Sequence, residues 1–263
     1  MTATTLLILR YELRNVLRGR WLVAYTVLLA GLAEALLRSG GSGRALLALV
    51  NLVLLVVPLV SVVFGALYLY ASREFNELLL SQPVGRPALF RGLYLGVALP
   101  LAAAFVAGIG LPFLWHGVEE PAHVRTLALV VAVGVGLTAV FVALAFLVAV
   151  RVEDRARGLG VVMLLWLAFA VIYDGMVLAV VSAFAQWPLE RPMLALMLMN
   201  PIDLARVLLL LELDLSAMLG YTGAVFRRFF GGTWGAPVAV LAMLAWVSLP
   251  LALAARAFRR KDF

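Results

Sequence analysis

The chain has 263 residues, of which 65% are hydrophobic and 13% charged, whereas soluble domains average about 45–50% apolar and about 25% charged residues. A chain of this size cannot hide so much apolar surface in one water-soluble core, so the composition excludes an ordinary soluble enzyme or binding domain. The formal net charge of +7 comes mainly from arginines at the ends of apolar segments, which favours membrane topology over nucleic-acid binding.

The first twenty residues are predicted to form an amphipathic elbow helix in the headgroup layer of the membrane. Apolar residues recur at helical spacing from Leu6 to Leu17. Charged residues four positions apart line another face of the same helix. The charged residues assigned to this elbow are Arg10, Glu12, Arg14 and Arg18. The alternative is a solvated extension of the first membrane helix.

Six apolar segments are long enough to cross the roughly 30 Å hydrocarbon core as helices. They cover residues 21–37, 44–71, 93–115, 124–150, 158–184 and 234–255, and a Gly/Ser-rich stretch at 39–43 predicts a turn between the first two. The sequence therefore predicts an all-α polytopic membrane protein with six transmembrane helices, in which residues 1–263 form a single transmembrane domain.

Residues 185–235 are predicted to form an external cap between spans five and six. The order Asn200-Pro201-Ile202-Asp203 is typical of a helix start, with an Asn cap, a proline at the first position and an acid at the third. Together with Arg206, these polar residues interrupt the apolar run at 193–211. We therefore expect two short helices that meet at a break and lie at the interface, where they form an external gate, rather than a seventh span.

The distribution of charge predicts the orientation. With six spans, the N-terminal tail, a loop at 72–92, a loop at 151–157 and the C-terminal tail share one side and carry about two thirds of the Lys and Arg residues. The positive-inside rule places that side in the cytoplasm. A seventh span would put the basic C-terminal tail outside. The prediction is a multi-pass protein of the bacterial inner membrane with both termini cytoplasmic.

The 72–92 loop contains a segment suited to binding a partner. Residues 73–80 combine charged and apolar residues at helical spacing, and Pro83 ends the segment. A short amphipathic helix that lies across the membrane surface can dock into a groove of another protein. The alternative is a connector that only lies on the membrane. The residues assigned to this docking helix are Arg73, Glu74, Phe75, Glu77, Leu78 and Leu79.

One ionisable residue, Asp174, lies beside Tyr173 inside the predicted fifth span. An acid within a membrane helix is by default a functional hypothesis. A proton relay through Asp174 would make the chain a proton-coupled secondary transporter. The alternative, which we favour, is a buried hydrogen bond to Tyr173 or to a neighbouring helix.

Enzymatic chemistry has little support in the sequence. There is no Cys, and the single lysine, Lys261, does not belong to a phosphate-binding Gly-Lys-Ser/Thr motif, so ATP hydrolysis would need another chain. The common hydrolase and metalloprotease motifs are also missing. Methionines such as Met193 and Met197, spaced four apart, could bind Cu(I), but apolar packing explains them better. We assign no catalytic residue, metal site or cofactor to this chain.

Several separated segments resemble ABC-2 type permeases. They are residues 11–21 at the start, residues 73–86 of the predicted docking loop and residues 258–262 at the end. Residues 200–206 and 213–226 are similar to the permease of the nitrous-oxide-reductase maturation system, which serves copper-site assembly. Many ABC-2 loops carry a Gly-Thr pair where this chain has Phe75-Asn76.

The resemblance implies how the predicted parts would work. The 73–80 helix would be a coupling helix that contacts a separate cytoplasmic ATPase, which would hold ATP and Mg. A homodimer of six-span subunits, and a periplasmic accessory protein seated on it, would complete the assembly. A scaffold for a periplasmic assembly machine, without transport, would share this fold.

Overall fold

The structure is a computed structural model that describes residues 10, 16, 19–80, 85–118, 120–184, 190–212 and 235–260. Helices make up almost all of these residues, and none of them lies in a β-strand. The predicted all-α class is therefore confirmed. Most of the predicted elbow, including Glu12, Arg14 and Arg18, and residues 185–189 and 213–234 of the predicted cap lie outside the described residues.

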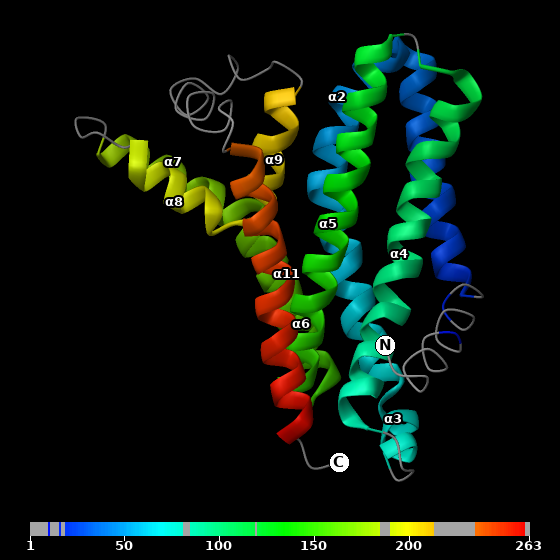
Figure 1. Ribbon diagram of the computed structural model, residues 1–263, viewed down its shortest axis with the longest axis vertical. Coiled ribbons are helices and arrows are strands. Elements are labelled where there is room, and N and C mark those ends of the chain that lie inside the picture. The colour runs from blue at the N-terminus through cyan, green and yellow to red at the C-terminus, as the bar shows by residue number, and fades with distance from the viewer. Residues whose placement is uncertain are drawn as a thin grey trace.

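Helix α2, Arg20–Ala71, contains the first two predicted spans. A straight helix of its 52 residues would be about 78 Å long, more than twice the hydrocarbon thickness. Gly41 divides it, with φ 73° and ψ 178°, into a first arm at 20–40 and a second arm at 42–71. Figure 1 shows the first arm rising and the second descending. The predicted five-residue turn is thus shorter than expected, because one glycine with positive φ reverses the chain.

Three helices follow the second arm. Helix α3 spans Arg73–Leu80, α4 spans Arg86–His116 and α5 spans Pro121–Arg151. The structure confirms the predicted helix over 73–80. Helix α4 begins at Arg86, earlier than the predicted residue 93, because a proline in its first turn has a backbone that suits a helix start. The predicted 72–92 loop therefore contains α3 and the first turns of α4.

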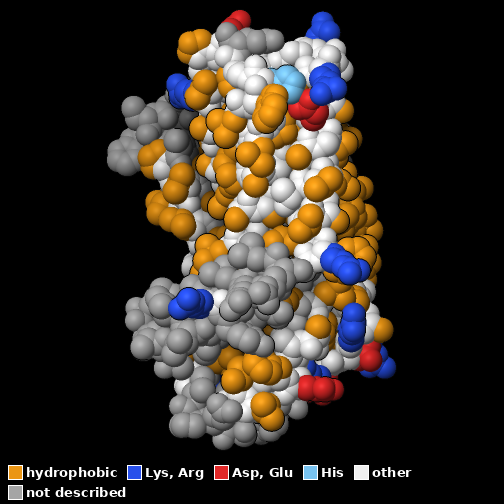
Figure 2. Space-filling view, turned by 90° about the vertical axis from the view of Figure 1, so that its right-hand side faces the viewer, with side chains coloured by type: hydrophobic (Ala, Val, Ile, Leu, Met, Phe, Trp, Pro, Cys, Tyr) orange, Lys and Arg blue, Asp and Glu red, His pale blue; other side chains and the backbone are white. Residues whose placement is uncertain are grey.

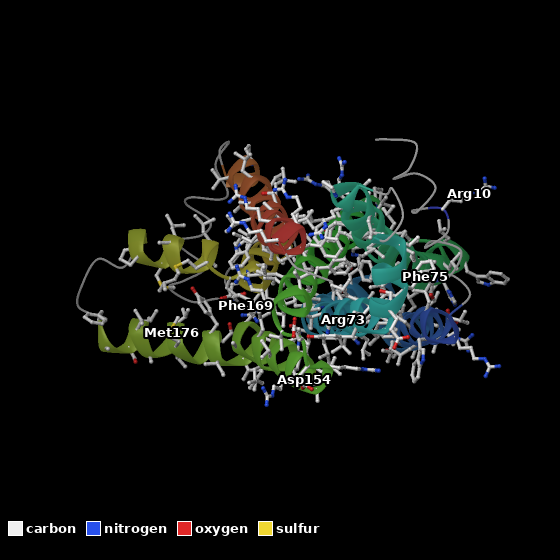
Figure 3. All side chains as sticks on the ribbon, turned by 90° about the horizontal axis from the view of Figure 1, so that it is seen from below. Arg10, Arg73, Phe75, Asp154, Phe169 and Met176 are labelled. Atoms are coloured by element: carbon white, nitrogen blue, oxygen red, sulfur yellow. The ribbon has the colours of Figure 1, made fainter. Side chains whose placement is uncertain are left out.

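The fifth predicted span is divided into three helical segments. They are α6 at Arg155–Leu167, the π-helix η1 at Ala168–Ile172 and α7 at Tyr173–Ala183. The Asp154 side chain caps α6 by accepting a hydrogen bond from the Arg157 backbone N–H at 2.7 Å. Beyond the wider turns of η1, α7, with Met176 in its first turn, leans away from the bundle (Figures 1 and 3).

Two short helices and one long helix complete the described chain. Helix α8 spans Glu190–Leu198, α9 spans Pro201–Glu212 and α11 spans Gly235–Arg260. The axes of α8 and α9 differ by 107° at their break. The predicted pair of short helices that meet at residue 200 is therefore confirmed. The length and composition of this bent pair also fit a single broken membrane span or a re-entrant loop.

The core lies where α2, α4 and α5 pack together. Five phenylalanines on α4 and α5 are buried to 2% or less and fill this space. They are Phe90, Phe105, Phe113, Phe141 and Phe146. Helices α6 and α7 lie at the edge, where most of their side chains are exposed, and fewer than half of the described side chains of α11 are exposed. Figure 2 shows hydrophobic side chains over much of the described part of one face, as expected for a protein that faces lipid.

Five helical stretches of the described chain are long and apolar enough to cross a membrane, and one of them is the divided helix α2. Helix α3, the connection between α5 and α6, and the last turn of α11 lie at one end of the bundle, which we call the α3 end (Figure 1). The Gly41 turn and the connection between α4 and α5 lie at the other end, which we call the Gly41 end.

Candidate functional site

Helix α3 presents apolar side chains at the α3 end. Phe75 is 37% exposed and Leu78 is 60% exposed, whereas Leu79 is partly buried against the core of the bundle. Glu74 is exposed in the first turn, where its negative charge interacts favourably with the helix dipole. The side chain of Glu77 lies outside the described residues. Figure 3 looks onto this end and labels Arg73 and Phe75.

The start of α3 is tied to the connection between α5 and α6. The Arg73 Nη1 atom donates a hydrogen bond to the Glu153 carbonyl at 3.2 Å, and its Nη2 lies 3.8 Å from the Glu153 carboxylate. One turn earlier, the Tyr70 hydroxyl donates to the Val152 carbonyl at 2.8 Å. Exposed ion pairs contribute little stability. Their consequence here is geometric, because they fix the start of α3 and the end of α2 against the connection that precedes α6.

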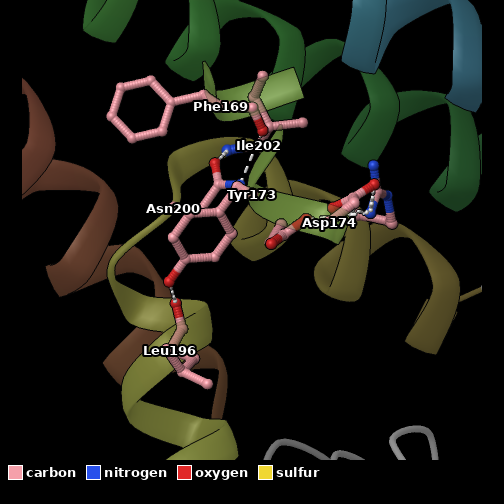
Figure 4. A network of polar contacts seen from close by, with 8 residues as sticks. Phe169, Tyr173, Asp174, Leu196, Asn200 and Ile202 are labelled. Carbon is pink, nitrogen blue, oxygen red and sulfur yellow. Dashed lines mark hydrogen bonds and ion pairs between the residues drawn. The ribbon is translucent and has the colours of Figure 1, made fainter. Parts of the chain in front are cut away.

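A second polar group joins α7 to α9, and we call it the α7–α9 junction. It consists of Tyr173, Asp174, Asn200, Asp203 and Arg206 (Figure 4). The sequence had predicted Tyr173 and Asp174 as an intramembrane pair, and Asn200, Pro201, Asp203 and Arg206 as a separate external gate. The structure brings Tyr173 and Asp174 into one cluster with Asn200, Asp203 and Arg206.

Arg206 links the two carboxylates of the junction. Its Nη1 donates to both carboxylate oxygens of Asp174, at 3.0 and 2.9 Å, and to Oδ1 of Asp203 at 3.0 Å. The three side chains are 30%, 40% and 10% exposed for Arg206, Asp174 and Asp203. Two acids thus share one guanidinium, and the cluster carries a formal charge of −1 when all three groups are ionised.

Asn200 makes two bonds at the break between α8 and α9. Its Oδ1 accepts a hydrogen bond from the Ile202 backbone N–H at 2.9 Å, which confirms the predicted cap. Its Nδ2 donates to the Phe169 carbonyl in η1, also at 2.9 Å. A π-helix leaves carbonyl groups without their usual i+4 partner. The fully buried Asn200 amide therefore joins α9 to the middle of the fifth predicted span.

The last turn of α8 receives two further side-chain bonds. The Tyr173 hydroxyl donates to the Leu196 carbonyl, and the Trp246 indole of α11 donates to the Leu198 carbonyl at 2.9 Å. The final carbonyls of any helix lack intrahelical partners. Trp246 also meets Phe169 edge to face, with ring centroids 5.5 Å apart. The break between α8 and α9 is thus held by η1, α7 and α11 together.

Helix α9 is largely buried within the protein, and the predicted interfacial position of the two short helices stays a prediction. Five apolar residues of α9 are no more than 2% exposed. They are Ile202, Leu204, Ala205, Val207 and Leu209. A helix that is apolar over most of its circumference is stable only when it is enclosed. Helix α9 accordingly packs against α5 and α11 inside the protein.

Two of the methionines considered for copper binding are buried. Met193 and Met197 are 1% and 8% exposed, and Met197 contacts an apolar cluster that includes Leu204 and Val207. Met199 is 62% exposed. The part of the chain that the structure describes has no cluster of three or more His, Cys, Asp or Glu side chains that could hold a metal ion.

The two histidines both lie at the Gly41 end and contact residues of α2. His116 Nδ1 is 3.3 Å from Oε2 of Glu34. The other carboxylate oxygen of Glu34, Oε1, accepts a hydrogen bond from Arg38 Nε at 2.7 Å. His123 Nδ1 is 2.8 Å from the Ser42 hydroxyl. These contacts join the first two predicted spans to the third and fourth at this end.

Sequence reasoning missed several parts of the junction. It predicted a partner for Asp174 but did not identify Arg206, which lies 32 residues further along the chain. Asp174 and Arg206 each lie in an otherwise apolar segment, and a charge in the membrane needs an opposite charge. This pattern could have predicted that the two residues pair. The roles of the Phe169 carbonyl and Trp246 have no such signal, because they depend on a π-helix that hydropathy does not reveal.

Known proteins resemble this chain over nearly its whole length. A model of the ABC-2 family of transporter proteins matches residues 50–263. A protein of Stutzerimonas stutzeri named "Probable ABC transporter permease protein NosY" is 28% identical over 274 aligned residues, which cover 97% of each chain. Its namesake in Pseudomonas aeruginosa PAO1 is 30% identical over 273 residues, with the same coverage. The chain therefore belongs to the ABC-2 family of transporter proteins, as a permease-type membrane subunit.

Proposed function

We propose that this subunit couples ATP hydrolysis on a separate cytoplasmic ATPase to movement of the α7–α9 junction. The ATPase would hold ATP and Mg, and α3 would dock on it as the coupling helix. The observation that carries the proposal is the anchored, amphipathic α3, whose exposed Phe75 and Leu78 lie at one end of the bundle. Its bonds to the connection between α5 and α6 provide a path to α6, η1 and α7.

The proposed topology has six spans in the inner membrane, with both termini and the α3 end in the cytoplasm. The two arms of α2 supply spans one and two, and α4, α5, α6–α7 and α11 supply the other four. The α8–α9 pair would then be a bent insertion near the outer side. The grouping of α3, the α5–α6 connection and the last turn of α11 at one end supports this arrangement.

The proposed assembly is a homodimer, with a periplasmic accessory protein at the Gly41 end. In the most apolar 18 residues of the span Arg155–Ala183, only 6% are buried within one chain. This span therefore has a large surface against which a second copy of the chain could pack. The NosY relatives, and the resemblance of residues 200–226 to the permease of nitrous-oxide-reductase maturation, support a role in copper-site assembly of that enzyme. ATP hydrolysis would drive either export of a substrate or mechanical transmission to the periplasmic protein.

The second candidate function, proton-coupled secondary transport through Asp174, has less support. Both oxygens of this carboxylate are bonded to Arg206, as expected for a structural ion pair. Its test is Asp174→Asn in a reconstituted system. A loss of proton-coupled flux with unchanged ATP-dependent activity would favour the second candidate.

The coupling proposal is tested by co-purification of the ATPase with two forms of the detergent-solubilised chain. In one form, Phe75 and Leu78 are both changed to Asp, while the partly buried Leu79 is left intact. The matched control carries Leu114→Asp and Trp115→Asp, which are 81% and 89% exposed at the Gly41 end. We expect wild type and control to retain an active ATPase and the α3 variant to lose it. Equal retention by both variants would remove α3 as the coupling element.

A further inference from the structure

A cavity of about 510 Å³ opens beside the first turn of α2, and it is separate from the α7–α9 junction. Its lining comes from the start of the first arm, the last turns of the second arm and the middle of α4. The lining is almost entirely apolar, as at Trp21, Leu67 and Leu101. Among the described residues around it, Arg155 is the one charged residue.

The cavity lies at a membrane depth that suits a lipid. It is at the α3 end, because it is lined by Ala71 at the end of the second arm and by Arg155 at the start of α6. Trp21, which is 74% exposed, and Tyr68 both line it. Trp and Tyr side chains concentrate at the level of the lipid headgroups. We therefore expect the cavity to extend from the level of the headgroups into the apolar interior of the same leaflet.

Arg155 is available for a ligand at the polar edge of the cavity. Its side chain is exposed and forms no hydrogen bond or ion pair with the part of the chain that the structure describes. The neighbouring acids are occupied elsewhere, since Glu153 contacts Arg73 and Asp154 caps α6. A guanidinium binds phosphate oxygens through paired hydrogen bonds, which a lysine cannot reproduce.

We propose that this cavity binds one anionic glycerophospholipid from the leaflet at the α3 end. The acyl chain fills the apolar cavity and Arg155 binds the phosphate. The volume lies within the roughly 300–1,000 Å³ of typical ligand pockets. A soluble phosphate compound has no apolar part that matches this lining, whereas the acyl chain of a phospholipid does. A lipid held there contacts both arms of α2 next to α3, and the proposal does not depend on ATPase coupling.

The test measures binding of phosphatidylglycerol to the delipidated full chain in detergent by native mass spectrometry. We expect one saturable lipid per chain, with about tenfold weaker binding after Arg155→Ala, because a charge-assisted bond to phosphate is lost. Arg157→Ala is the matched control, since it removes the same charge from an exposed residue of the same helical turn. Leu67→Trp fills the cavity and should abolish the saturable lipid.

Three results would overturn the proposal. Equal affinities for the Arg155→Ala and Arg157→Ala variants would show that the headgroup is not bound at Arg155. An unchanged affinity after Leu67→Trp, in protein that elutes as one symmetrical peak, would show that the acyl chain lies elsewhere. Displacement of the lipid by inorganic phosphate alone would show that the site recognises free phosphate rather than a phospholipid.

Discussion

Replacement of Arg206 by Ala tests the α7–α9 junction most sharply. The change removes three charge-assisted hydrogen bonds and leaves the carboxylates of Asp174 and Asp203 without a cation. Removing one partner of a fully buried ion pair costs about 3–5 kcal/mol. Water reaches this cluster, because Arg206 and Asp174 are 30% and 40% exposed. We therefore expect a loss of about 2–3 kcal/mol in the free energy of unfolding.

The assay is thermal unfolding of the purified chain in detergent. At about 2–4 °C per kcal/mol for a protein of this size, Arg206→Ala should lower the Tm by about 5–10 °C. The control is Arg38→Ala, whose guanidinium is 74% exposed and pairs with Glu34, so its loss should cost less than about 1 kcal/mol. Adding Asp203→Asn to Arg206→Ala should restore part of the Tm, because it relieves carboxylate repulsion. Equal Tm shifts for Arg206→Ala and Arg38→Ala would refute the reasoning.

Three further changes test the backbone features. Gly41→Ala should lower the free energy of unfolding by about 1–3 kcal/mol, because the backbone angles φ 73° and ψ 178° suit only glycine. The control Gly31→Ala, with open space at its Cβ, should not lower the Tm. Asn200→Ala should lower the free energy of unfolding by about 2 kcal/mol, because it removes the helix cap and the hydrogen bond to η1. Asn200→Ser can still cap α9, so it should lower the free energy of unfolding by about half as much. Gly158→Ala should lower both the Tm and the ATPase coupling, because its Cβ would overlap the hydroxyl of Tyr70.

Much of the fold follows from local sequence. Apolar runs of about 20 residues predict the long helices, since only a helix satisfies its own backbone in lipid. The order Asn200-Pro201-Ile202-Asp203 predicts the start of α9 because capping depends on adjacent residues alone. The amphipathic pattern of residues 73–80 likewise predicts α3. These features depend on interactions within a few residues, which a sequence displays directly.

The remaining features depend on contacts between distant segments. The pair of Asp174 and Arg206 joins residues on different helices, and nothing local selects that arginine over others. The burial of α9 depends on its packing against α5 and α11, which the local sequence of residues 201–212 does not display. The π-helix at Ala168–Ile172 differs from an α-helix in hydrogen bonds that join residues five rather than four positions apart, and the apolar pattern does not distinguish the two.

The most direct test of ATPase coupling uses the absence of cysteine from the sequence. A single cysteine at Leu78 on α3, and in a second variant at Leu114 at the Gly41 end, would each be treated with a short thiol-to-amine cross-linker in native membranes. We predict that the Leu78→Cys variant forms a cross-linked product containing the ATPase subunit, with a yield that changes when ATP is added. The Leu114→Cys variant should give no such product. A product from Leu114→Cys and none from Leu78→Cys would contradict the account, because the ATPase would then contact the opposite end of the bundle.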